Sequence, residues 1–76
     1  MNSNGFPSRE AVERVRNMYP TGCRVELISM DDSYSSLTHG TKGTVRSVDD
    51  TGTVFVRWDN GSGLGVVYGV DRIRKL

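Results

Sequence analysis

The sequence is almost without cysteine and histidine, having only Cys23 and His39 among its 76 residues. One cysteine cannot form an internal disulfide, and these two side chains cannot supply the four Cys and His ligands of a conventional zinc site. We therefore expect no metal and no cofactor. The lack of crosslinks in a domain of this size suits a reducing cytoplasm.

The sequence also lacks an excess of charge and a long apolar run. Ten Lys and Arg against nine Asp and Glu give a net charge of +1, without the surplus typical of a dedicated nucleic-acid binder. No apolar run is long enough for a signal peptide or a membrane span. These features predict a cytoplasmic protein that does not enter the membrane.

Residues with catalytic chemistry are few. Cys23 alternates in phase with apolar residues of a predicted strand, which indicates a core position rather than a nucleophile. The acid pairs Asp31-Asp32 and Asp49-Asp50 lie in polar turns, where neighbouring carboxylates stay solvated and ionised. We therefore predict a protein that is not an enzyme.

Glycine, in contrast, is abundant, with nine in the chain. Residues 40–69 read as three short strands joined by turns at 49–52 and 59–61, and Asn-Gly in the second turn is a strong hairpin signal. Glycines within and between such strands allow the sharp bends of a curved antiparallel sheet. This pattern favours a small barrel.

One helix is expected at residues 8–19, after a flexible tail at 1–7. Ser8 is a good N-cap, and Pro20 ends the helix. Apolar residues at spacings of three and four form one stripe, which consists of Val12, Val15 and Met18 or Tyr19.

Five strands are expected at 23–29, 43–48, 53–58, 64–68 and 72–76. Val45 and Val48 are three residues apart, so a bulge near Arg46-Ser47 is needed if both are to face inward. The prediction is a mainly β domain at 8–76: a five-stranded SH3-like antiparallel barrel, residues 22–76, with the helix packed on it. Ile28 and Phe55 point out of this barrel, and we expect the helix to cover them.

The candidate binding residues are aromatic and acidic. Tyr34 lies in the irregular polar stretch at 30–40, while Trp58 and Tyr68 end two strands. If the stretch folds back over the hairpin, these three rings line a shallow surface groove suited to an extended peptide. The alternative is that Trp58 and Tyr68 cap a small core. Acceptors or negative charge beside the groove would come from Asp31, Asp32 and Asp59.

The chain resembles a small bacterial and phage family that is catalogued only as a domain of unknown function. The resemblance runs from Ser8 to the C-terminus and rests on residues 24–32, Gly-Thr-Lys-Gly-Thr-Val at 40–45, Trp-Asp-Asn-Gly-Ser-Gly-Leu-Gly at 58–65, and 68–71. It implies a bacterial or mobile-element origin and brings no activity, substrate or cofactor.

The second half is also similar to the mind-bomb-type (Mib–Herc) module. The shared residues are 43–45, 54–61 and Tyr68. That module is a small SH3-like β-barrel that binds peptides. The similarity implies the barrel fold and, through it, peptide binding.

These observations favour a non-enzymatic binding module that recognises a protein or peptide. One alternative is a nucleic-acid-binding accessory domain, which predicts a contiguous Arg/Lys face and salt-sensitive affinity. Another is a structural or self-associating protein, because a thin core and open strand edges favour association. We expect a monomer or a weak homodimer.

Overall fold

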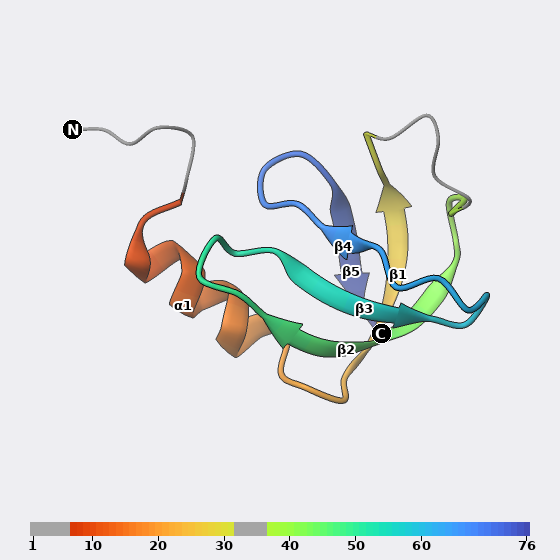
Figure 1. Cartoon of the computed structure of the whole chain (residues 1–76), viewed down its shortest axis with the longest axis horizontal. Coiled ribbons are helices and arrows are strands. Elements are labelled where there is room, and N and C mark those ends of the chain that lie inside the picture. Colours follow the sequence, from red (N-terminus) through yellow and green to blue (C-terminus); the bar gives the residue numbers. More distant parts are fainter. Residues whose placement is uncertain (1–6, 32–36) are drawn as a thin grey trace.

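The computed structural model describes residues 7–31 and 37–76. They form one helix and one five-stranded antiparallel sheet (Figure 1). The elements are α1 (Arg9–Met18), β1 (Arg24–Ser29), β2 (Lys42–Val48), β3 (Val54–Trp58), β4 (Gly65–Val66) and β5 (Arg72–Lys75). The prediction of a mainly β domain with one helix and five antiparallel strands is confirmed.

The sheet does not close on itself. The strand order is β4-β3-β2-β1-β5, so β4 and β5 are the two edges and do not pair with each other. β4 has two residues, whereas the sequence predicts a strand at 64–68. The chain turns at Val67, whose carbonyl accepts the N–H groups of Val70 and Asp71. β4 and β5 are not joined, and neither a barrel nor an SH3-like fold is established.

Local sequence signals explain α1. Ser8 Oγ accepts a hydrogen bond from the Ala11 N–H at 3.1 Å, which confirms the predicted N-cap. The helix ends at Tyr19, whose N–H donates to the Val15 carbonyl. The buried side of the helix consists of Ala11, Val12 and Val15.

The predicted docking of this helix is wrong. Phe55 remains 38% exposed and Met18 52% exposed, so the helix does not cover the outer face of the sheet. Instead Val15 joins the core on the opposite, concave face, together with Val25 and Val54. The physical reason is that an unclosed sheet leaves its concave apolar face uncovered at one end, and the apolar stripe of α1 packs there.

β3 provides the centre of this core. Val54, Val56 and Trp58 are buried, while Phe55 and Arg57 between them are exposed. The predicted outward direction of Phe55 is therefore confirmed. The alternation along this strand places the largest buried side chain, Trp58, on the concave face.

The predicted bulge in β2 is also confirmed. Val45 pairs with Val56, but the next paired residue is Ser47, opposite Phe55, so Arg46 is the extra residue. As a result Val45 and Val48 both pack against the core, and Arg46 and Ser47 are both exposed.

Gly43 allows β2 and β3 to approach closely, and we predict that Gly43→Ala lowers the free energy of unfolding. An added Cβ would lie 2.5 Å from Val56 Cγ1 and 2.8 Å from the Arg57 carbonyl oxygen. We expect a loss of about 2 kcal/mol or more in urea denaturation, the range of an overpacked core. Gly63→Ala is the control, because no atom lies within 4 Å of its added Cβ. Equal stability of the two variants would contradict the close packing.

Candidate functional site

The three aromatic residues predicted to share a groove do not all lie at the surface. Trp58 is 1% exposed, and its Nε1–H donates to the Leu64 carbonyl at 2.9 Å. The indole is therefore a core group, and its assignment to a surface groove is corrected. Tyr68 is 44% exposed and remains a candidate. Tyr34 and Asp32 fall outside the described residues.

The two acidic candidates among the described residues, Asp59 and Asp31, lie at opposite ends of β1. The Asp59 carboxylate accepts two hydrogen bonds from Arg24, at 2.8 and 2.6 Å. These bonds and the charge of Arg24 hold the pKa of Asp59 below its ordinary value. Asp31 lies beyond the other end of β1, where its backbone N–H donates to Asp71 Oδ1 at 2.8 Å. The two acids thus do not converge on one site.

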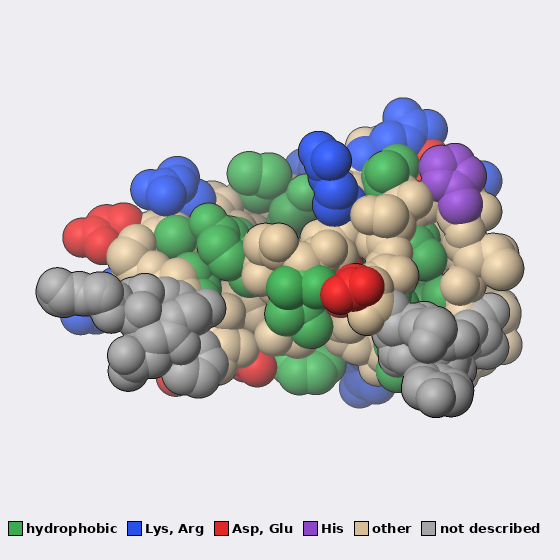
Figure 2. All heavy atoms as spheres, turned by 90° about the horizontal axis from the view of Figure 1, so that it is seen from above, with side chains coloured by type: hydrophobic (Ala, Val, Ile, Leu, Met, Phe, Trp, Pro, Cys, Tyr) green, Lys and Arg blue, Asp and Glu red, His purple; other side chains and the backbone are tan. Residues whose placement is uncertain are grey.

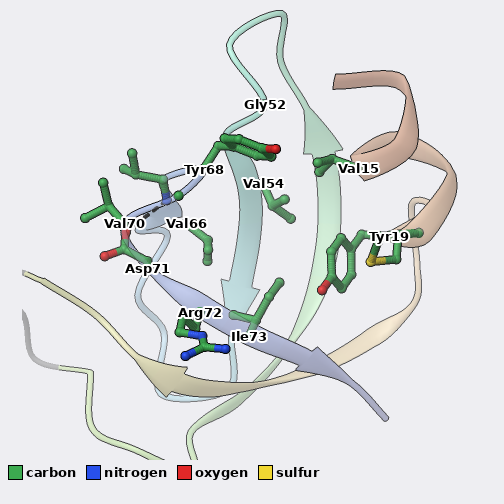
Figure 3. Close-up of a pocket in the computed structure, with 13 residues that line it drawn as sticks. Val15, Tyr19, Gly52, Val54, Val66, Tyr68, Val70, Asp71, Arg72 and Ile73 are labelled. Atoms are coloured by element: carbon green, nitrogen blue, oxygen red, sulfur yellow. Dashed lines mark hydrogen bonds between the residues drawn. The ribbon is translucent and has the colours of Figure 1, made fainter. Parts of the chain in front are cut away.

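The structure has instead a different cavity, which we call the apolar groove (Figure 3). It has a volume of about 560 Å³ and lies between the end of α1, the start of β3 and the segment that joins β4 to β5. Its lining residues are Val15, Met18, Tyr19, Gly52, Val54 and residues 66–73. It occupies the concave side of the sheet at the place where β4 and β5 fail to pair.

Exposed hydrophobic side chains are concentrated around the apolar groove. Seven large hydrophobic side chains are exposed in the part of the chain that the structure describes, and four of them line this cavity: Met18, Val67, Tyr68 and Val70. Figure 2 shows hydrophobic side chains reaching the surface in the middle of the face that carries the β4–β5 connection. Apolar groups gathered in this way are typical of interaction sites.

Asp71 fixes the segment that carries three of these side chains. Its Oδ2 accepts the Val67 N–H at 2.9 Å, and its Oδ1 accepts the Asp31 N–H. Gly69 within the turn has φ +76°, which only glycine adopts without strain. The backbone of the turn that carries Val67 and Val70 is therefore held by hydrogen bonds at both ends.

The turn between β2 and β3 supports Tyr68. A Cβ built on Gly52 would lie 3.4 Å from Tyr68 Cβ and 3.3 Å from Pro7 Cγ. Gly52 also has φ +81°. The absence of a side chain here lets the tyrosine pack against the turn, which forms one wall of the apolar groove.

Tyr19 supplies a polar group to the interior of the groove. Figure 3 shows the Tyr19 ring reaching from the end of α1 toward Ile73 of β5, and both residues line the cavity. Burial, with a smaller contribution from Cys23, raises the pKa of the Tyr19 phenol, so the hydroxyl stays protonated. Within residues 7–31 and 37–76 this hydroxyl makes no hydrogen bond, and it is free to bind a polar atom of a ligand.

The remaining chemistry of the described residues is sparse. No three His, Cys, Asp or Glu side chains among them are placed to hold a metal ion. His39 Nδ1 lies 2.9 Å from the Ile28 carbonyl oxygen, and Cys23 packs against the core. No helix in this part of the chain is long and apolar enough to cross a membrane.

Sequence reasoning missed most of the apolar groove. It identified Tyr68, but it gave no role to the residues between the strands predicted at 64–68 and 72–76, and it placed Met18 in the buried stripe of the helix. A signal was present, because apolar Val67 and Val70 stand where a surface turn ordinarily has polar residues.

We predict that Asp71→Ala loosens the turn that borders the groove. Loss of a charged acceptor removes about 1.5 kcal/mol or more, so the Val67 and Asp31 amides should exchange with solvent about tenfold faster or more. Amide hydrogen exchange by NMR measures this, with Asp50→Ala as a control whose carboxylate bonds only Arg16. Unchanged protection at Val67 would contradict the proposed anchoring role.

We also predict that the Asp59–Arg24 pair makes stability depend on pH. Because the folded pKa of Asp59 is lowered, its contribution is complete above the ordinary carboxyl pKa of about 4 and is lost as the pH falls through the folded value. Asp59→Asn should therefore be less stable than wild type at neutral pH, with the difference shrinking in acid. Denaturant unfolding across this range tests it, and a difference independent of pH would count against the pair.

Comparison with known proteins places the chain in a family without assigning a function. No curated protein matches the chain. A family model described as "Domain of unknown function (DUF4314)" matches residues 8–76. The resemblance to a family of unknown function is thus confirmed, while the similarity to the mind-bomb-type module stays a prediction. The chain belongs to the DUF4314 family.

Proposed function

We propose that this domain is a non-enzymatic module that binds a protein partner by holding an extended peptide segment in the apolar groove. The observation that carries the proposal is the collection of exposed Met18, Val67, Tyr68 and Val70 around one cavity. Binding here would remove all four from water. Burying one side chain the size of valine contributes about 1.5 kcal/mol or more.

The size of the cavity supports a ligand of modest volume. About 560 Å³ lies within the range of roughly 300–1,000 Å³ that is usual for binding sites. The walls are mainly apolar, and the phenol of Tyr19 offers a hydroxyl to the groove. This combination suits an apolar side chain and a neighbouring peptide carbonyl, which would accept a hydrogen bond from the phenol.

The unpaired strand edges support an extended conformation of the ligand. β5 pairs with β1 on one side only, and β4 pairs only with β3. Ile73 of β5 lines the groove, so backbone N–H and C=O groups of an edge strand lie next to the apolar surface. A peptide that adds to such an edge gains main-chain hydrogen bonds as well as side-chain contacts.

Selection from a displayed random-peptide library on immobilised protein tests the proposal. Val70→Ser and Leu76→Ser form a matched pair, because the two side chains are 49% and 50% exposed but only Val70 lines the groove. Selected peptides should bind Val70→Ser about fourfold more weakly than wild type, because about half of one valine side chain remains to be buried. Leu76→Ser should bind as wild type does.

Two results would contradict the proposal. One is a library that yields no binder, or binders equally affected by both substitutions. The other is sedimentation of wild type as a stable dimer that Val70→Ser dissociates, since a second copy of the chain would then occupy the groove.

A further inference from the structure

The outer face of the sheet has a second hollow, which we call the arginine depression. It has a volume of about 720 Å³, and its lining includes Arg46, Ser47, Phe55, Arg57 and residues 61–63. Cross-strand pairing places Ser47 beside Phe55, and the bulge adds Arg46 to the same exposed segment. Arg57 lies on the same exposed side of β3 as Phe55. The depression therefore brings together two arginines, the Ser47 hydroxyl and the Phe55 ring.

The two arginines in this depression have no partner among the described residues. Two other arginines of the strands do have ion pairs: Arg24 binds Asp59, and Arg74 binds Glu26. Arg46 and Arg57 make no ion pair and no side-chain hydrogen bond within residues 7–31 and 37–76. No acidic side chain lines the depression. A positive potential thus remains at this place, although the net charge of the whole chain is only +1.

The hairpin at the side of the depression is open to close approach. Nothing lies within 4 Å of a Cβ built on Gly61 or Gly63. The Gly63 N–H makes no hydrogen bond in the described part of the chain. A backbone N–H that is not used within the fold and lies beside cationic side chains is a further donor for an anion.

Phe55 gives the depression a feature that simple anion binding does not need. Its side chain is 38% exposed on the outer face of β3, which α1 does not cover. An exposed aromatic ring beside unpaired arginines is the combination by which open sheets hold single strands: bases stack on the ring while cations bind phosphates.

We propose that the arginine depression binds single-stranded nucleic acid, with Arg46 and Arg57 holding backbone phosphate and Phe55 stacking on a base. The site lies on the outer face and is independent of the apolar groove on the concave side. Duplex nucleic acid fits this account poorly, because its paired bases do not expose a face to Phe55.

Fluorescence anisotropy tests the site by measuring the affinity for a short labelled oligodeoxythymidine, and for an oligouridine of the same length, at several salt concentrations. Arg46→Gln and Arg57→Gln should each lower the slope of log affinity against log salt by about 0.7. Phe55→Leu should weaken binding about fivefold or more, because the stacking of one base is lost. Arg14→Gln is the control of equal charge change, since Arg14 is exposed on α1 and has no ion pair among the described residues.

Several outcomes would overturn the proposal. These are no binding of either strand at low salt, an equal effect of Arg14→Gln and Arg57→Gln, or unchanged affinity in Phe55→Leu. Equal binding of a duplex of the same length would do so as well. All the substituted side chains are exposed, so circular dichroism should show a folded protein in each case.

Discussion

One carboxylate links the ends of three strands. Asp71 accepts the backbone N–H of Val67, directly after β4, and that of Asp31, which lies 40 residues away after β1. Asp71 itself directly precedes β5. β4 ends after two residues at the same place. Asp71 also lines the apolar groove, so this linkage lies at the open side of the sheet.

An open, curved sheet has two chemically different faces, and the register separates them. On the concave face, Val54, Val56 and Trp58 form the core with Val15 of α1, and the apolar residues that cannot be buried border the groove. The outer face has the residues in between, including Phe55 and Arg57. The proposed peptide site and the proposed nucleic-acid site thus use opposite faces of the sheet.

Features governed by a few neighbouring residues could be predicted from the sequence. The cap at Ser8, the alternation in β3 and the bulge at Arg46 each depend on local hydrogen bonding or on a period of two. The position of α1 could not be predicted, because it depends on whether the sheet closes. The burial of Trp58 could be predicted from its phase with Val54 and Val56. The bond between Asp71 and Asp31 at the open side joins residues 40 positions apart, and no local pattern announces a contact over that separation. The groove was missed because it forms between segments far apart in the sequence. Tyr68, which lines it, was among the candidate residues.

The central claim is that the sheet stays open between β4 and β5 while α1 covers part of its concave face. Nuclear Overhauser contacts in solution test it most directly. The account predicts contacts between the Val15 methyl groups and the valines of the core, and none between the backbones of Val66 and Ile73. Backbone contacts between β4 and β5, together with a Val15 side chain remote from the core, would show a closed barrel and contradict the account.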